Sequence, residues 1–467
     1  MARALAGLVA LVAAQGCVRY VPQPVEPAAH AAEYRARRLS EPQLVAWVSR
    51  WSERPAAGRW TDRQLALAAL GLRAELARAR AEWRAALAAE RSAGARPAPG
   101  AAAGVERAVS GSEGASPWVV SLGALLSVEL GGKRGARLQR ARARTALAEA
   151  ELRRTAWRIA SETRAAALAL AEAEAERAES EREARALAEV ESLERARYQE
   201  AALTAAELAR TASEVQEAKF RVSVAEGAAI DARAALAGLT ALPLASLDSL
   251  EIEPEAGSGC VAIVALGDDS LAALALTRRP EIGRALAEYA VAEADLRAAV
   301  ARQYPDLDIG PGFIWDQGVH RWTLALALPN LLGFRNRAAV DEALAGRAAA
   351  AARVAEAQDE LLGDVARATG RCRGAQIEAA AADSQVAVAH RTAALAQAAY
   401  DRGETARLDP VLAELGVVRA ERSRRLQAAR LVAAGRGLEA ALGGSAAAES
   451  DRWPDPRSDV LMEEVPK

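Results

Sequence analysis

One long stretch without helix-breaking residues limits the possible folds of this chain more than any other feature. Between Lys133 and Gln199 there is no proline, and there is no glycine after Gly135. The stretch is rich in Ala, Glu, Arg and Leu, which all favour helix. A helix of about 65 residues is roughly 100 Å long at 1.5 Å per residue. No globular core can enclose such a helix, so we predict an elongated, mainly helical molecule.

The chain also contains an internal repeat, because many landmarks recur 202 positions later without a gap. The register holds from about Val120 to Leu239 and again from about Trp322 to Ala441. Large apolar residues, glycines and tyrosines carry the match, since alanine-rich helices align with each other too easily. The clearest pairs are Leu126 with Leu328, Gly131 with Gly333, Leu193 with Leu395, and Tyr198 with Tyr400. A fixed long period indicates two copies of one structural unit.

Each copy contains a segment in which apolar side chains alternate with small or polar ones. In the second copy the alternation runs from Leu307 to Trp315 and from Trp322 to Leu328, on either side of an Asp-Gln-Gly turn. Alternation with period two is typical of a strand with one exposed face, so we predict a β-hairpin here. In the first copy only the strand Val120–Val128 is clear, and Pro97–Pro117 is a weak candidate for its partner.

Helices flank these strands in both copies. We predict a first helix over Asp62–Arg91 and its counterpart over Asp268–Gln303. After the strands, long helices over 133–199 and 336–401 are each followed by a break and a shorter helix, at 205–239 and 410–442. A narrow stripe of large residues flanked by alanines lets such helices pack closely as coiled coils. Each copy is therefore predicted to form a long antiparallel helical hairpin.

The N-terminus has the pattern of a secretory signal. Arg3 precedes an apolar run over Ala4–Ala14 that is too short to span a membrane. Cys17 directly follows Gly16, as in a bacterial lipoprotein box, although positions 14 and 15 depart from the usual pattern. We predict a signal peptide over 1–16 and a lipid anchor on Cys17. The alternative is a plain signal peptide that ends near a cysteine.

The composition argues against nucleic-acid binding and against the common enzyme classes. The 60 Lys and Arg residues nearly balance 62 Asp and Glu residues, so the chain is not strongly basic. HExxH, CxxC, GxSxG and P-loop motifs do not occur in the sequence. The three histidines, His30, His320 and His390, are far apart. We expect no catalytic, cofactor-binding or metal-binding residues, no cofactor and no enzymatic activity.

The two remaining cysteines are Cys260 and Cys372, which lie in a glycine-rich linker and in a predicted helix. They can pair in an oxidising compartment. We expect instead that both are unpaired structural cysteines, because their contexts differ.

The first long helix carries an acidic run from Glu172 to Glu194, with arginines interspersed. We expect this run to form a solvated face, and the lining of a tunnel is the alternative. The equivalent segment of the second copy, Gly374–Ala396, is nearly uncharged. The two copies are therefore predicted to face different surroundings.

The order of these elements resembles the TolC-like outer-membrane efflux protein family over about residues 62–443. The matching pieces come before the second-copy helix, before the hairpin, at both strand-to-helix junctions and at both helical tips. They are Ala275–Ile282, Gln303–Leu307, Leu130–Arg134 with Leu332–Arg335, and Arg197–Glu200 with Tyr400–Glu404 and Asp409.

This resemblance implies a homotrimer in the outer membrane of a Gram-negative bacterium, with its helices in the periplasm. Each subunit would give two β-hairpins to a membrane barrel of about 12 strands and its helical hairpins to an α-barrel. Elementary physics supports part of this expectation. Four strands cannot close a barrel, and an open sheet edge is not tolerated in lipid. Strands placed in the membrane therefore require oligomerisation.

The resemblance also implies that the helical tips form a periplasmic gate. There they would meet an adaptor protein that connects the channel to an inner-membrane pump. Tyr400 and Asp409 match the family's gate tyrosine and acidic residue, and Tyr198 and Glu207 are their first-copy equivalents. The alternatives are that both tyrosines only pack the hairpins, and that both acids only favour helix starts through the helix dipole.

The turns at the two tips differ. Gly403 keeps the family's turn glycine in the second tip, and Arg402 beside it is expected to pair with an acid of the neighbouring hairpin. In the first tip Ala201 and Ala202 stand where the glycine is expected. A sharp left-handed turn is less favourable without glycine, so the first tip is predicted to be the poorer docking surface.

These observations predict six segments and one function. The segments are a signal peptide (1–16), a lipid-anchored segment (17–61), a first repeat (62–242), a linker (243–269), a second repeat (270–443) and an irregular tail (444–467). We predict an outer-membrane channel subunit of a tripartite efflux or type I secretion system, which conducts passively from periplasm to exterior. The alternative is a lipid-anchored periplasmic coiled-coil scaffold or adaptor without a pore.

Overall fold

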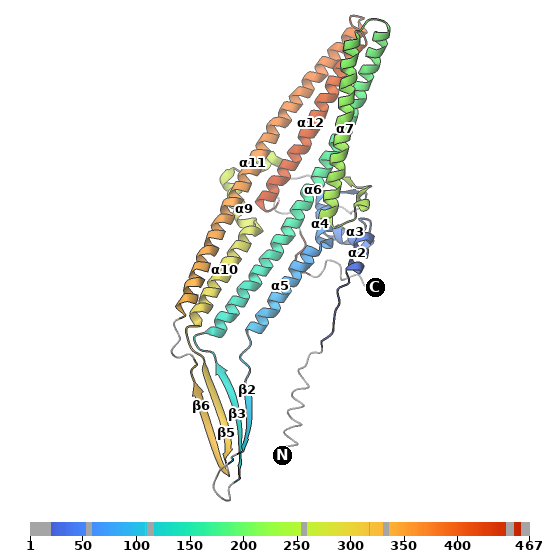
Figure 1. The fold of residues 1–467 in the computed structure, drawn as a ribbon. Coiled ribbons are helices and arrows are strands. Elements are labelled where there is room, and N and C mark those ends of the chain that lie inside the picture. Colours follow the sequence, from blue (N-terminus) through green and yellow to red (C-terminus); the bar gives the residue numbers. More distant parts are fainter. Residues whose placement is uncertain are drawn as a thin grey trace.

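The computed structural model describes residues 20–52, 58–107, 109, 116–253, 259–316, 318–329, 336–444 and 453–458. The molecule is a long rod (Figure 1). A small β-sheet lies at one end, the tips of two helical hairpins lie at the other, and short helices surround the middle. The mainly helical fold is confirmed. The predicted signal peptide and Cys17 lie outside the described residues.

Four helices make up most of the rod and pair as two antiparallel hairpins. α6 (Lys133–Gln199) is followed by α7 (Ala205–Thr240), and α11 (Arg337–Asp401) is followed by α12 (Leu408–Leu442). α6 and α11 have 67 and 65 residues, so each is about 100 Å long. The predicted long helices and their return helices are confirmed, with boundaries that differ by two residues at most.

The helix that precedes each strand pair is broken once, so the prediction of two continuous helices is wrong. The four pieces are α4 (Asp62–Leu72), α5 (Ala74–Ala93), α9 (Asp268–Arg278) and α10 (Pro280–Ala301). Arg73 and Arg279 separate them, with extended ψ angles of 119° and 125°. Pro280 explains the second break, because the residue before a proline avoids the helical region.

The strands of both copies join in one sheet. They are β2 (Gly100–Arg107), β3 (Trp118–Val128), β5 (Leu307–Asp316) and β6 (Val319–Ala327). The order is β2-β3-β5-β6, and all neighbouring strands are antiparallel. The predicted hairpin of β5 and β6 is confirmed. The weak candidate segment of the first copy contains β2, which pairs along its whole length with β3.

The largest apolar core lies around the middle of the rod, mainly in the first repeat. Two short helices precede it, α2 (Pro27–Ala36) and α3 (Pro42–Trp51). Leu44 and Trp47 of α3 are buried in this core together with most of α4. Trp453, near the other end of the chain, packs against the same core, and Arg80 donates to the carbonyl oxygen of Pro456 at 3.0 Å. The segments on both sides of the two repeats are thus held by the first repeat.

The segment between the repeats carries short elements of its own. They are η1 (Leu244–Leu247), β4 (Glu251–Ile252), which pairs in parallel with β1 (Arg59–Trp60), and α8 (Gly259–Val264). α8 packs against α11 and α12, and this brings Cys260 to Cys372. The two form a disulfide with their Cα atoms 5.4 Å apart. The expectation of unpaired cysteines is wrong, because Cys260 lies on a short helix docked against α11.

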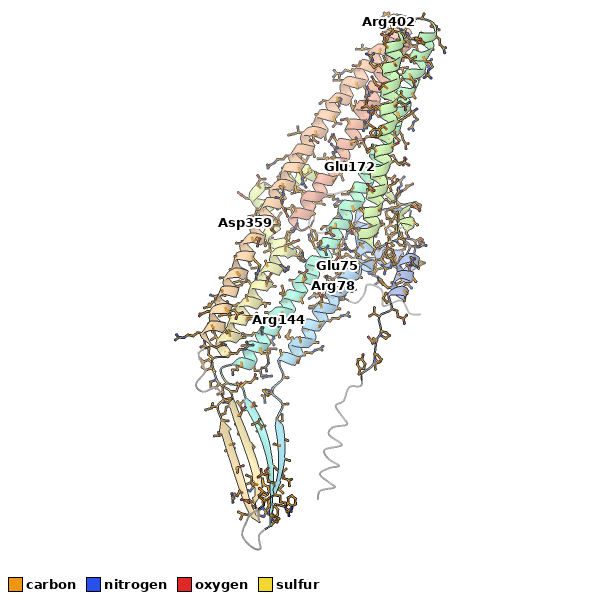
Figure 2. The ribbon with its side chains drawn as sticks, viewed as in Figure 1. Glu75, Arg78, Arg144, Glu172, Asp359 and Arg402 are labelled. Atoms are coloured by element: carbon orange, nitrogen blue, oxygen red, sulfur yellow. A yellow bond between two sulfur atoms is a disulfide. The ribbon has the colours of Figure 1, made fainter. Side chains whose placement is uncertain are left out.

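The acidic segment of α6 packs against other helices, so the expectation of a solvated face is also wrong. Glu183 is buried and accepts hydrogen bonds from Arg221 of α7 at 3.1 Å and from Arg419 and Arg422 of α12 at 3.0 and 2.8 Å. Further pairs between α6 and α12 are Glu172–Arg430, Glu176–Arg422 and Glu179–Arg425. We call all the pairs between α6 and α12 the ionic seam. Glu172 lies midway along the rod (Figure 2).

Candidate functional site

The turn from α6 to α7, which we call tip 1 (residues 198–207), closes as a Schellman motif. The N–H of Ala201 donates to the carbonyl of Tyr198 at 3.0 Å, and the N–H of Ala202 donates to that of Arg197 at 2.8 Å. These bonds satisfy carbonyl groups that the helix end leaves open. Ala201 has a φ of +57°, a left-handed conformation that costs an alanine roughly 1–2 kcal/mol. Tip 1 therefore stores strain at the position where the sequence lacks glycine.

The turn from α11 to α12, tip 2 (residues 400–409), repeats the same bonds. The N–H of Gly403 donates to the carbonyl of Tyr400 at 2.8 Å, and the N–H of Glu404 donates to that of Ala399 at 2.9 Å. Gly403, which is the counterpart of Ala201, has a φ of +75°. Glycine accepts this conformation without a steric penalty. The two tips thus have the same backbone conformation, and only the first is strained.

Glu207 of tip 1 caps the start of α7. The N–H of Glu207 donates to the hydroxyl of Thr204 at 3.2 Å, and the N–H of Thr204 donates to the Glu207 carboxylate at 2.9 Å. This reciprocal arrangement is a capping box. The hydroxyl and then the N–H of Thr204 hold the pKa of the exposed Glu207 carboxyl below its usual value. The geometry matches the helix-start alternative for Glu207, and its role in a gate stays a prediction.

Tip 2 has no equivalent of this capping box. Asp409 lies exposed in the first turn of α12, and Ala406 stands where tip 1 has Thr204. Within the described ranges, the Asp409 carboxylate has no hydrogen-bond or ion-pair partner. An unpartnered carboxylate at a helix end is free to meet another molecule.

Arg402 lies at the very end of the rod (Figure 2). Its guanidinium donates from Nε and Nη2 to the two carboxylate oxygens of Glu404, at 2.6 and 2.8 Å. The Glu404 hydrogen bond raises the pKa of Arg402. Within the subunit Arg402 is therefore paired inside its own tip, and a contact with a neighbouring hairpin stays a prediction.

The two tyrosines are half-exposed, with 45% of Tyr198 and 37% of Tyr400 accessible. Tyr400 lines a groove of about 690 Å³ between α6, α11 and α12. Its other polar lining residues are Glu189, His390, Gln397, Arg407 and Glu414. Tip 2 therefore borders a hollow with both signs of charge, whereas Tyr198 of tip 1 does not line it.

At the opposite end of the rod, the sheet has two chemically different faces. Residues directly opposite each other in neighbouring strands share a face. One face carries Leu122, Phe313 and Trp322, which follow each other across β3, β5 and β6. The other face carries mainly small or polar residues, among them Ser121, Gly123, Gly312 and Thr323, together with the apolar Leu125 and Ile314. On the first face Leu122 and Trp322 are exposed, with 51% and 84% of their surface accessible, and Phe313 between them is half-buried.

At the junction between the sheet and the helices, two of the sequence segments that resemble the efflux family lie next to each other. Gly131 has a φ of +68°, and a Cβ there would lie 2.4 Å from the Tyr304 ring. Only glycine fits this position. Lys133 Nζ lies 2.8 Å from a carboxylate oxygen of Asp306. The Leu130–Arg134 and Gln303–Leu307 pieces, which are far apart in the chain, thus meet where the strands become helices. The second-copy junction Leu332–Arg335 lies outside the described residues.

Two kinds of feature are absent from the described ranges. No helix there carries an apolar stretch of the length that a membrane crossing needs. No group of three or more His, Cys, Asp or Glu side chains there is placed to hold a metal ion.

Comparison with known proteins adds independent findings. Residues 271–444 match the family model described as outer membrane efflux protein. The structure resembles VceC from Vibrio cholerae, with a TM-score of 0.65 at 20% identity, over 82% of this chain and 96% of that chain. It also resembles the CmeC channel of Campylobacter jejuni, with a TM-score of 0.63 at 15% identity, over 82% and 85%. No curated protein matches the chain.

The chain has the fold of the TolC-like outer-membrane efflux proteins. A third structure with this fold is the open MtrE channel of Neisseria gonorrhoeae, with a TM-score of 0.54 at 20% identity, over 91% of this chain and 98% of that chain. The resemblance expected from the sequence is confirmed, and the match to the outer membrane efflux protein model lies in the second repeat. The first repeat has the same hairpin architecture although the family model does not reach it.

Sequence reasoning missed the most elaborate polar cluster of this efflux-protein fold, the ionic seam. Its glutamates were visible as an acidic run, but their partners on α12 lie more than 230 positions away. One signal was available. Arg419, Arg422 and Arg425 are spaced three apart along α12, so they approach one helix face.

Proposed function

We propose that this chain is the channel subunit of a tripartite efflux or type I secretion system in the outer membrane of a Gram-negative bacterium. Three copies would combine their four-stranded sheets into one membrane barrel and their helical hairpins into one periplasmic tunnel. Solutes would cross passively, with energy supplied by an inner-membrane pump. This chain would catalyse no reaction.

The single observation that carries the proposal is the amphipathic sheet with two open edges. Within the described ranges, β2 and β6 each pair on one side only. In lipid every backbone N–H and C=O must be paired, so only a closed barrel can place this sheet in a membrane. The face with Trp322 and Phe313 suits contact with lipid, and the face with Gly312 and Thr323 suits a water-filled lumen. A coiled-coil scaffold without a pore has no use for such a sheet.

We propose that the two tips form the periplasmic gate and the surface that meets the adaptor protein. In a trimer the tips would surround the tunnel axis, with Tyr198, Glu207, Tyr400, Arg402, Gly403 and Asp409 at the constriction. Asp409 is exposed and, within the described ranges, unpartnered, which supports its place at this constriction. Three carboxylates around a narrow aqueous opening favour cations.

We propose further that Cys17 is lipidated and anchors the subunit. Acyl chains contribute about 0.8 kcal/mol per buried methylene, so several chains on one cysteine bind a membrane firmly. In a Cys17→Ala variant the sheet alone would hold the protein in the membrane.

Planar bilayer recording with the purified full-length protein tests the proposal. We expect discrete conductance steps, together with an oligomer on gels that dissociates on heating. Asp409→Asn should lower the preference for cations over anions. The control is Asp401→Asn, at another exposed carboxylate of tip 2, which accepts a hydrogen bond from Gln397. A protein that elutes as a monomer and adds no conductance would overturn the proposal.

A further inference from the structure

The two long helices differ in burial at matched positions. On α6, positions 172, 176, 179, 183, 186, 190 and 193 are spaced by threes and fours and lie on one face. This face meets α12, and Val190 on it is 2% accessible. The counterparts on α11 follow 202 positions later. There Val388 is 54% accessible and Leu395 is 73% accessible, although their counterparts Ala186 and Leu193 pack against an apolar cluster.

The two return helices show the same contrast. Arg422 of α12 lies in the ionic seam with 22% of its side chain accessible, but its counterpart on α7, Phe220, is 68% accessible. Positions that face the inside of each hairpin are buried in both copies: Val215 is 1% accessible and Val417 is 4% accessible. The exposed faces therefore do not reflect a looser hairpin. Each lacks the lateral neighbour that its counterpart has.

We call Glu217, Phe220, Val224 and Ala228 the α7 flank, and Gly374, Glu378, Ala381, Gln385 and Val388 the α11 flank. We infer that the α7 flank of one subunit binds the α11 flank of a second copy of this chain, with Phe220 as the anchor. The occupant follows from the repeat. α12 of the second repeat docks on α6 of the first, so the same step between subunits brings α7 to α11. A contact between two different faces of identical chains closes into a ring when the rotation from one subunit to the next divides a full turn, as it does in the proposed trimer.

The register of this contact follows from the ionic seam. Arg422 bonds Glu176 and Glu183, and Glu179 lies between these two glutamates on the same face. A shift by 202 positions places Phe220 between Glu378 and Gln385, opposite Ala381. An arginine among three glutamates is thus replaced by a phenylalanine above an alanine. The small side chain leaves room for the ring.

The two interfaces therefore differ in chemistry. The interface within the subunit is ionic, and the interface between subunits is apolar at its centre. Salt screens exposed charge pairs but does not weaken apolar burial. The mismatch also gives specificity, because Phe220 placed on α6 would leave Glu176, Glu179 and Glu183 without the arginine partners that α12 provides. The inference rests on the proposed trimer and adds the residues that hold it together.

Cysteine cross-linking in isolated membranes tests the register. In the Phe220→Cys/Ala381→Cys variant, with Cys260 and Cys372 left in place, we expect mild oxidation to link subunits into a covalent trimer. The matched control is Phe220→Cys/Leu395→Cys, whose cysteines would lie about 20 Å apart along α11 and should not link. A trimer by native mass spectrometry without cross-linking at 220 and 381 would overturn this inference and leave the proposed function intact. A wild-type chain that is monomeric would overturn both.

A charge conversion tests the chemistry without relying on a disulfide. Phe220→Arg should reduce the trimer fraction about tenfold or more at fixed protein and detergent concentration, as expected for loss of an aromatic anchor. Gln385 is the counterpart of Glu183, which pairs with Arg422. Adding Gln385→Glu to Phe220→Arg therefore gives the new arginine an acidic partner, and it should restore the trimer at low salt but not at high salt. The control for folding is Asp383→Asn, which changes one charge at an exposed position of α11 outside the flank and should leave the trimer fraction within about twofold. Failure of the double variant to recover any trimer at low salt would contradict the assigned contact.

Discussion

α6 and α11 have nearly the same length, similar hairpin partners and opposite surroundings. The middle of α6 carries a dense run of glutamates and is enclosed by α7 and α12, whereas the matched part of α11 is nearly uncharged and exposed. Positions inside the two hairpins, such as Val215 and Val417, have stayed alike. Two copies of a repeat thus keep the contacts that each makes with itself. They diverge where they meet different neighbours.

The largest effect that we expect concerns the disulfide. It stabilises the second repeat, and the first repeat has no counterpart of it. Cys260→Ala/Cys372→Ala removes a link across 112 residues. We expect the free energy of unfolding to fall by about 4 kcal/mol, because a long loop in the unfolded chain is no longer constrained. Chemical denaturation of the detergent-solubilised protein measures it. Reduction of the wild type is the control and should give the same loss, and a change below about 1 kcal/mol would contradict the account.

A second prediction compares matched positions of α6 and α11. Glu183→Ala leaves Arg221, Arg419 and Arg422 without the buried carboxylate that they share. We expect a loss of about 3 kcal/mol in the free energy of unfolding, because the arginines lose the one buried carboxylate and keep only more exposed partners, Glu217, Glu214 and Glu176. Gln385→Ala, at the exposed counterpart, should change it by about 0.5 kcal/mol or less. Equal losses would break the comparison between the two helices.

The tips provide a smaller and reciprocal effect. Gly403→Ala forces an alanine into a left-handed turn, and Ala201→Gly removes one from the equivalent turn. We expect the first change to destabilise its tip by about 1 kcal/mol and the second to stabilise its tip by a similar amount. Hydrogen exchange of the amides in residues 198–207 and 400–409 measures both. Changes of the same sign would show that the two turns are not equivalent.

The smallest expected effect is a difference in acid sensitivity at the two tips. Because the folded pKa of Glu207 lies below its ordinary value of 4.5, its contribution to the α7 cap is complete above that value. The contribution is lost as the pH falls through the lower, folded pKa. We therefore expect amide hydrogen exchange at the start of α7 to become faster in acid, after correction for the intrinsic pH dependence of exchange. The start of α12, with Ala406 in place of Thr204, should show no such rise, and Thr204→Ala should abolish it.

Much of the fold was predictable because its signals are local. Uninterrupted helix formers between Lys133 and Gln199 defined α6, and alternation from Leu307 to Leu328 defined a hairpin. The repeat then predicted the matching elements, including β2, whose own sequence is a weak strand signal. The breaks at Arg73 and Arg279 were not predicted, although Pro280 marks one of them.

The features that sequence reasoning got wrong depend on contacts between distant segments. The partners of Glu183 on α12 and the pairing of Cys260 with Cys372 follow from how α12 and α8 dock, which no local pattern encodes. At the tips, the Schellman turns recur at the predicted register. The capping box of Glu207 was not predicted, because Thr204 was overlooked as the first half of a Thr-x-x-Glu motif; only a helix-start role for Glu207 was considered, as an alternative.

The central claim is that three copies close into one ring through flanks that the single subunit leaves exposed. Native mass spectrometry of the full-length protein released from outer membranes tests it most directly. The account predicts a particle of three subunits that persists in high salt and is lost in the Phe220→Arg variant. A wild-type particle of one subunit under the same conditions would contradict the account.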